Sequence, residues 1–435
     1  MFRGEPLAYW TIIIGFICYL MTQYIGMLLT GIIHPAIIIY PKIHQYIAIL
    51  GWIGITIMGA QLQFHRAVTG LRRYKPNYFR LVFILGLFGG VTSILLSSMY
   101  NSSTLFLMGF VFYTVSVTIQ FYWIFSLRKS KHYKFPLDYF FYSQIFLIIY
   151  LLWALFGIAK SYTSSDGELP YHLLIHSLPD NHVLTFGWIS LTLQGAIIRI
   201  LPMFVNKHIN RESRYLLDHH LKFTVFSSII FSSGYWLNYA AITIIGGLLW
   251  SISWIIVFHI LIKSLVNTGK STENKLTLLY FIPGLLWMTI GVFLGWYMWI
   301  FDLHQRYLLL IHIHLTLFAG LSLLMLGAIH RINAFQIYTL IYTGNRKEGV
   351  SLEYFLQKKK FFITGIGLNI SPLIMISGFI VTDYNIVGIG GIMNFVFSII
   401  FASGLVTNMV HYLKNKSNAI PFWLKANETI SQNID

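Results

Sequence analysis

Long apolar stretches separated by short basic segments run through this 435-residue sequence. An α-helix needs about 20 apolar residues to cross the hydrocarbon core of a bilayer, and twelve stretches are near that length. They cover residues 8–33, 45–64, 80–99, 104–126, 138–158, 182–204, 221–239, 241–263, 277–301, 307–330, 361–381 and 387–413. Only 10% of the residues are charged, so most of the surface must face lipid rather than water. The sequence therefore predicts an all-α integral membrane protein with twelve transmembrane helices in a lipid bilayer.

Basic residues lie mainly on one side of the predicted membrane. If the N-terminus is cytoplasmic, the segments on that side hold 26 Lys and Arg, and the opposite side holds only Lys42, Lys160 and Arg306. Positive residues concentrate on the cytoplasmic side of membrane proteins. The bias therefore places both termini in the cytoplasm and favours a multi-pass protein of the cell membrane. It also explains the net charge of +16, so we expect no nucleic-acid partner.

Three segments of the chain align without a gap on a Gly-Ala pair. The anchor glycines Gly59, Gly195 and Gly327 are 136 and 132 residues apart, which is four predicted helices each time. Many membrane folds are built from internal repeats of this kind. The sequence therefore predicts a single membrane domain over 1–435, made of three four-helix repeats and a cytoplasmic tail. The aligned segments are 44–60, 180–196 and 312–328, the repeats lie near 1–130, 131–270 and 271–413, and the tail is 414–435.

Histidines stand at the start of all three aligned segments. His44 and His312 share one register position, and His182 and His314 share another position two residues later. On the predicted topology all four lie at one depth near the outer face. Ionisable side chains within membrane spans are costly and usually functional. Because residues two apart on an α-helix differ in direction by about 200°, His312 and His314 face opposite ways and suit two separate planar cofactors.

Other histidines and the aromatic residues have simpler interpretations. His65 and His330 lie at inner helix ends, where we expect them at the membrane interface. Twelve Trp and 27 Tyr are explained mostly by aromatic belts at the two interfaces. The single cysteine, Cys18, excludes a covalently attached c-type haem, which needs a CxxCH motif.

The aligned histidines resemble those of subunit I of the haem–copper oxidase superfamily, especially its cbb3-type and nitric-oxide-reductase branch. The tenth stretch carries HxHxxxxxG, the second carries HxxxxxxG, and the sixth carries a His followed by GAxxRxxP. The resemblance implies three four-helix arcs with pseudo-threefold symmetry and two non-covalent haems. It implies that His44 and His314 are the axial ligands of a low-spin haem. His312 then matches the proximal ligand of a second haem, and His182 matches the sixth-helix copper ligand.

The sequence departs from this family at the copper centre. The family has a His-His pair at the outer end of the seventh helix, where this chain has FSSGYWLNYAA. The only His-His pair, His219 and His220, lies at the inner start of this helix, about 27 Å along the helix axis from its outer end. Because His182 would be the only strong protein ligand, too few for a stable copper site, copper is not expected. No acidic residue lies mid-membrane, so a carboxylate proton relay is unsupported. Near the outer face, Lys42, His304 and Arg306 are the cationic candidates for propionate contacts.

The resemblance implies a haem-binding subunit of a respiratory electron-transfer complex, in a hetero-oligomer with a second redox subunit. Its haem would be b-type or another non-covalent form. His182 either faces an open, five-coordinate second haem or ligates that haem itself. Three alternatives stay open: an active terminal oxidase or nitric oxide reductase, an NnrS-like haem protein of the nitric oxide response, and a haem-free structural subunit.

Overall fold

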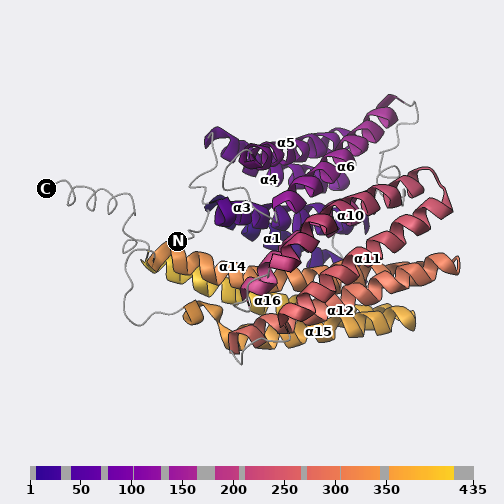
Figure 1. Cartoon of the computed structure of the whole chain (residues 1–435). Coiled ribbons are helices and arrows are strands. Elements are labelled where there is room, and N and C mark those ends of the chain that lie inside the picture. Colours follow the sequence, from indigo (N-terminus) through magenta and orange to yellow (C-terminus); the bar gives the residue numbers. More distant parts are fainter. Residues whose placement is uncertain are drawn as a thin grey trace. The chain divides into compact units, whose positions relative to one another are not determined.

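The computed structural model describes residues 6–30, 41–69, 77–100, 102–128, 137–163, 182–204, 211–265, 272–303, 305–342 and 352–415. Within these ranges every secondary-structure element is a helix (Figure 1). Ten of the described helices are long and apolar enough to cross a membrane. The all-α class predicted from the apolar stretches is confirmed, and the chain is a multi-pass membrane protein.

A helix lies at each of the twelve apolar stretches, but two of these helices fall short of the criteria for a membrane span. The apolar helix over Val183–Arg199 is shorter than the others. The helix α10 (Arg211–Trp236) begins with the polar sequence RESRYLLDHHLK, which lowers its mean hydropathy. The count of twelve membrane crossings therefore stays a prediction for these two helices.

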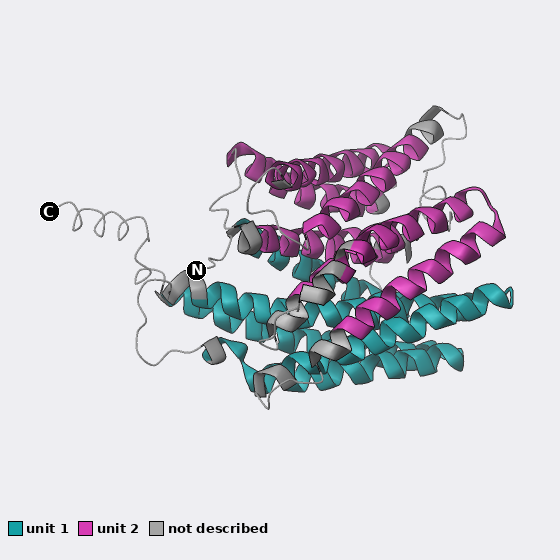
Figure 2. Ribbon diagram, in the orientation of Figure 1, with its two compact units in different colours: residues 1–39, 271–435 teal, residues 40–270 magenta. Residues whose placement is uncertain are grey.

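The chain divides into two compact units, one over residues 1–39 and 271–435 and the other over residues 40–270 (Figure 2). The boundary at residue 270 coincides with the predicted boundary between the second and third repeats. Unit 1 contains α1 (Pro6–Leu29), α12 (Thr272–Ile300), α13 (Arg306–Ile313), η3 (His314–Leu321), α14 (Ser322–Tyr342), η4 (Leu352–Leu356), α15 (Lys358–Ile380) and α16 (Tyr384–Asn415).

Unit 2 contains the elements of the first two repeats that follow the first helix. Its antiparallel neighbours α4 with α5 and α10 with α11 pack along their lengths, and α6 packs against η2 and α9. The elements are α2 (Pro41–Tyr46), η1 (Ile47–Ile55), α3 (Thr56–Thr69), α4 (Asn77–Met99), α5 (Ser103–Arg128), α6 (Leu137–Thr163), η2 (Val183–Ile189), α9 (Ser190–Phe204), α10 and α11 (Ala240–Leu265).

Tight turns join three helix pairs, and each turn contains a residue in the left-handed region. Asn238, Asp302 and Thr382 have φ values of 51°, 52° and 56°. In each turn the next N–H returns to a carbonyl five residues earlier, as in the bond from the Leu303 N–H to the Met298 carbonyl at 2.8 Å. This motif satisfies carbonyls at a helix end. The turn at Asp302 sends α13 back along α12, which places the start of the tenth stretch against the end of α12.

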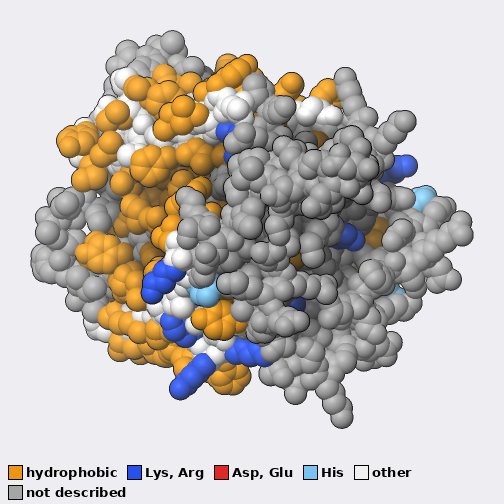
Figure 3. Space-filling model, turned by 90° about the vertical axis from the view of Figure 1, so that its left-hand side faces the viewer, with side chains coloured by type: hydrophobic (Ala, Val, Ile, Leu, Met, Phe, Trp, Pro, Cys, Tyr) orange, Lys and Arg blue, Asp and Glu red, His pale blue; other side chains and the backbone are white. Residues whose placement is uncertain are grey.

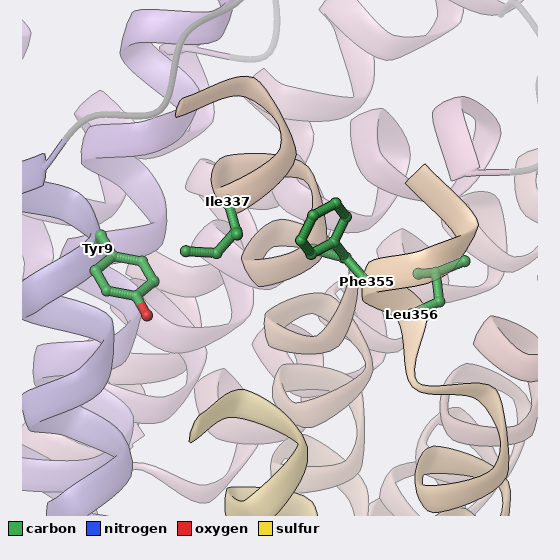
Figure 4. Close-up of a cluster of buried hydrophobic side chains, with 5 residues drawn as sticks. Tyr9, Ile337, Phe355 and Leu356 are labelled. Carbon is green, nitrogen blue, oxygen red and sulfur yellow. The ribbon is translucent and has the colours of Figure 1, made fainter. Parts of the chain in front are cut away.

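The short 3₁₀ helix η4 is anchored in the interior of unit 1. Phe355 and Leu356 are buried, and they cluster with Ile337 of α14 and Tyr9 of α1. Figure 4 shows Ile337 between the rings of Tyr9 and Phe355 in this view. Nε2 of His330 lies 2.8 Å from the Leu356 carbonyl oxygen, and His330 is only 1% exposed. His330 is thus a buried link between α14 and η4, and its expected depth at the membrane interface stays a prediction.

Basic side chains gather at one end of unit 1. Lys358, Lys359 and Lys360 begin α15, and Lys414 lies in the last turn of α16. Figure 3 looks toward this end and shows Lys and Arg side chains in blue beside hydrophobic side chains in orange. The turn that contains Asp383 lies at the other ends of α15 and α16. These Lys side chains lie together at one end of the helices, and the orientation of that end in a membrane stays a prediction.

Candidate functional site

Each of the three aligned sequence segments contains a π-helix. The segments η1, η2 and η3 begin at Ile47, Val183 and His314, which are 12, 12 and 13 residues before the anchor glycines. Within the described residues, no other segment of the chain is a π-helix. π-Helices are rare and occur frequently at functional sites. Their shared register marks the start of these three helices, where the aligned histidines stand, as the candidate site.

In unit 1, His312 stands near the end of α13, and its ring lies against α12. Its Nδ1 is 2.7 Å from the carbonyl oxygen of Gly291. Because a carbonyl oxygen only accepts, Nδ1 carries the proton and donates, and the lone pair of the neutral ring is on Nε2. The glycines of α12 make this approach possible: a Cβ at Gly295 would lie 2.7 Å from Cε1 of His312. Gly291 and Gly295 thus form a seat for the ring.

His314, the first residue of η3, lies against a different neighbour. Its Nδ1 is 2.7 Å from the Leu310 carbonyl oxygen on the preceding turn, so this nitrogen also donates. The ring centroid is 5.2 Å from that of Phe379 on α15 and 6.0 Å from that of Phe318. Two imidazoles on one helix are therefore each fixed by a backbone carbonyl, and they contact α12 and α15 respectively. Metal-ligating histidines typically make this kind of second hydrogen bond.

In unit 2, His182 has different surroundings from the histidines of η3. It caps the start of η2, and its ring stacks on Tyr235 of α10 with a centroid distance of 4.3 Å and an interplanar angle of 16°. Phe186 and Phe231 lie 5.4 Å and 5.6 Å away, measured between ring centroids. Tyr235 and Phe231 belong to the FSSGYWLNYAA segment, so rings occupy the part of α10 where the family carries copper ligands. Among the described residues, no group of three or more His, Cys, Asp or Glu could hold a metal ion.

The remaining predicted site residues are spread over both units. His44 lies in α2 of unit 2, three residues before η1 begins, and is half-buried. Arg306 begins α13 and is exposed, six residues before His312. His304 and the side chain of Lys42 lie outside the described part of the chain. Because His44 and His314 belong to different units, their pairing as axial ligands stays a proposal.

Sequence reasoning missed His220, which is the centre of a buried hydrogen-bond network in unit 2. Its Nδ1 lies 2.5 Å from the Tyr139 hydroxyl, and its Nε2 lies 3.0 Å from the Ser253 hydroxyl. Thr224 and Gln194 extend the network through Ser253 at 2.7 Å and 3.2 Å. Buried polar groups need such partners. The sequence feature that could have indicated this network is the set of polar side chains on α6, α9 and α11 at the depth of His220.

His65 is also more deeply buried than the sequence predicts. Its side chain is 0% exposed, and its ring centroid lies 5.8 Å from that of Phe140 on α6. The expected depth of His65 at the membrane interface stays a prediction. A histidine near a helix end is buried when the neighbouring helix extends past it, which the apolar stretch alone does not reveal.

Comparison with known proteins adds no family to this description. No protein-family model matches the chain, and a search of curated proteins finds no significant sequence match. The resemblance to haem–copper oxidase subunit I is therefore carried by the spacing of histidines and glycines on three helices.

Proposed function

We propose that the chain is the haem-binding subunit of a membrane electron-transfer complex. The observation that carries this proposal is the state of His312 and His314. Each ring donates from Nδ1 to a backbone carbonyl at 2.7 Å, which leaves the Nε2 lone pair for a ligand. Haem iron takes an axial imidazole in this form.

The directions of the two rings favour binding of two planar cofactors rather than one compact metal site. His312 lies on the Gly291 and Gly295 seat of α12, whereas His314 contacts Phe379 of α15. A compact zinc site on a helix uses ligands that share one face, typically at i and i+4. Residues two apart with different helix neighbours do not meet that need. They suit one axial ligand to each of two haems.

The histidines then have distinct roles. His44 and His314 would be the ligands of a low-spin haem, and His312 would be the ligand of a second haem. A bound haem supplies one-electron transfer, and an iron with two imidazole ligands has no open position for a substrate. Arg306 and His304 would be the cationic candidates for propionate contacts near the outer face. The chain crosses the cell membrane twelve times with cytoplasmic termini, and a second redox subunit docks on its loops.

For the second haem, the packing of His182 favours the five-coordinate form. The ring already has a stacking partner in Tyr235 at 4.3 Å within its own unit. Leaving that position to bind iron would forfeit an aromatic contact worth about 0.5–1.5 kcal/mol. The stacked position of His182 therefore favours a second haem iron that His182 does not ligate.

Haem and metal analysis of the purified protein tests this function. The protein is expressed in a haem-replete host, and reduced-minus-oxidised and carbon-monoxide spectra are recorded on one sample with metal quantification. We expect two non-covalent haems per chain, one of which shifts with carbon monoxide, and no copper. Two haems that ignore carbon monoxide would mean that His182 ligates the second iron. A protein without haem would overturn the proposal in favour of a structural subunit.

The same sample separates the remaining alternatives. Copper or iron in excess of haem iron, together with oxygen or nitric oxide consumption, would identify an active oxidase or reductase. Tight nitric oxide binding without turnover would identify a protein of the nitric oxide response. Affinity purification from native membranes tests the partner, and we expect it to recover a subunit with copper or c-type haem.

A further inference from the structure

Each π-helix has one carbonyl that accepts a hydrogen bond from a side-chain hydroxyl. The Leu50 carbonyl of η1 accepts from the Tyr113 hydroxyl at 3.1 Å. The Phe186 carbonyl of η2 accepts from the Ser228 hydroxyl at 3.2 Å. The Leu317 carbonyl of η3 accepts from the Ser322 hydroxyl at 3.1 Å. Each of these carbonyls belongs to the fourth residue of its π-helix, so the bond recurs at one position of the π-helix, although Leu317 is one residue farther from its anchor glycine than Leu50 and Phe186 are.

The donors come from different elements, although the acceptors share one position of the π-helix. Tyr113 lies on α5 and Ser228 on α10, whereas Ser322 is the C-cap residue of η3 on the same helix. All three side chains are buried, between 0% and 3% exposed. A Cβ at Gly54 would overlap the Tyr113 hydroxyl, so η1 has a small residue where this donor approaches. Three different donors that meet one carbonyl position indicate a requirement of the π-helix itself.

A π-helix changes the direction in which the side chains of the preceding helical segment point, relative to those of the following segment. It fits one more residue into its turns than an α-helix of the same length does. Each residue of an α-helix turns the chain by about 100°. Loss of the π form would therefore rotate His312 by about that angle relative to α14, and away from the Gly291 carbonyl. Meanwhile the C-terminal part is held in place, because Gly327 packs on Tyr280 and Phe281 of α12.

We propose that η1, η2 and η3 set the direction of the histidines, and that Tyr113, Ser228 and Ser322 are positioning residues that hold these π-helices. The statement that η3 points His312 and His314 toward haem rests on the proposed function. The rotation itself concerns only this chain and is measurable without a cofactor.

A one-residue insertion tests the rotation. Insertion of one alanine after Leu315 adds a residue beyond the one that η3 already accommodates, and should turn His312 by about 100° away from the Gly291 carbonyl. We expect the haem bound at His312 and His314 to be lost. Deletion of Ala319 from the same variant restores the length of η3 and should restore haem binding. Haem retained by the insertion variant, with an unchanged spectrum, would overturn the inference.

A labelling experiment keeps the test independent of haem and of folding yield. In a background with Cys18→Ser, a single cysteine is introduced by His312→Cys, and its reaction with a maleimide is timed. Insertion of one alanine after Leu315 should change the labelling rate several-fold, because the side chain leaves the glycine seat. If the intact protein binds no haem but the labelling rate changes, the proposed function fails and this inference stands. An unchanged labelling rate contradicts the inference whether or not haem binds.

Hydroxyl variants test the positioning residues. Ser228→Ala removes the donor to η2, and Ser227→Ala is its matched control, because Ser227 is equally buried but bonds its own helix at Thr224, 2.9 Å away. With a cysteine in place of His182, we expect faster labelling in Ser228→Ala, an unchanged rate in Ser227→Ala, and recovery in Ser228→Thr. Equal labelling rates in Ser228→Ala and Ser227→Ala would show that the hydroxyl does not hold the π-helix.

Discussion

The starts of η2 and η3 share a backbone conformation but surround their histidines differently. At η3, His312 and His314 each donate from Nδ1 to a backbone carbonyl at 2.7 Å, which leaves the lone pair of the neutral ring on Nε2. At η2, His182 stacks on Tyr235 at 4.3 Å, with Phe186 and Phe231 nearby. The comparison shows that the start of a π-helix can hold an imidazole by a hydrogen bond to a backbone carbonyl or by stacking on an aromatic ring. The neighbouring helix decides which of these happens.

The neighbouring helices differ in the size of the residues that they offer. Next to η3, α12 has Gly291 and Gly295, and the ring of His312 rests on their backbone. Next to η2, α10 has Phe231 and Tyr235, whose rings cover the imidazole of His182. A glycine surface leaves a backbone acceptor within reach, whereas an aromatic surface offers only a stacking face.

Removal of the histidines should give the largest difference between the two regions. His314→Ala should remove the low-spin haem, because the iron loses an axial ligand that no neighbour replaces. His182→Ala should keep both haems, with a changed carbon-monoxide spectrum at most. Haem per chain is measured on purified variants, and His219→Ala, at an exposed position of α10, is the surface control. Equal haem loss in His182→Ala and His314→Ala would break the comparison.

A methyl group at the glycine contacts should give the next largest effect. Gly295→Ala puts a Cβ 2.7 Å from Cε1 of His312, and Gly187→Ala puts one into the ring of Phe146. Each substitution should cost about 1–3 kcal/mol through overpacking. Only Gly295→Ala should shift the haem spectrum, because only its methyl group displaces a ligand. Thermal unfolding and the spectrum are recorded together, and Gly391→Ala, whose methyl has an ordinary 3.4 Å contact, should change neither.

Removal of the ring beneath His182 should have a smaller effect. Tyr235→Leu loses the stacked pair at 4.3 Å and should lower the free energy of unfolding by about 0.5–1.5 kcal/mol beyond the area lost. Tyr235→Phe keeps a ring and should preserve most of that contribution. The midpoint of thermal unfolding in detergent measures both. A change in haem content with Tyr235→Leu would argue that η2 holds a ligand as η3 does.

The smallest effect is expected for the hydroxyl on α12. Thr289 bonds only the carbonyl of Leu285 on its own helix, at 2.7 Å. Thr289→Ala should therefore change the free energy of unfolding by no more than about 0.5 kcal/mol and should leave the haem spectrum unchanged. The same thermal and optical measurements apply. A spectral shift as large as that of Gly295→Ala would mean that the seat of His312 depends on more than glycine.

The helices and the histidine positions could be predicted from the sequence, because both follow from local patterns. Apolar length places a helix at each stretch, and the gapless alignment puts His44, His182, His312 and His314 in two shared registers. The same alignment placed a Gly-Ala pair in each of the three segments. It gave no sign that these segments are π-helices.

The rest depends on contacts between segments distant in the sequence. Tyr113 reaches the Leu50 carbonyl across 63 positions, and the Gly291 carbonyl meets His312 across 21. The burial of His220 depends likewise on Tyr139 and Ser253 from two other helices. A hydropathy pattern records which residues avoid water, but it does not record which side chain supplies a hydrogen bond to which carbonyl.

Low-temperature electron paramagnetic resonance of the oxidised protein tests most directly whether His312 and His314 are haem ligands. The wild-type protein from a haem-replete host should give a low-spin ferric signal of an iron with two imidazole ligands and a separate high-spin signal. We predict that His314→Ala abolishes the low-spin signal, that His312→Ala abolishes the high-spin signal, and that His182→Ala retains both. A wild-type spectrum without haem iron, or one unchanged by either substitution on α13 and η3, would contradict the assignment.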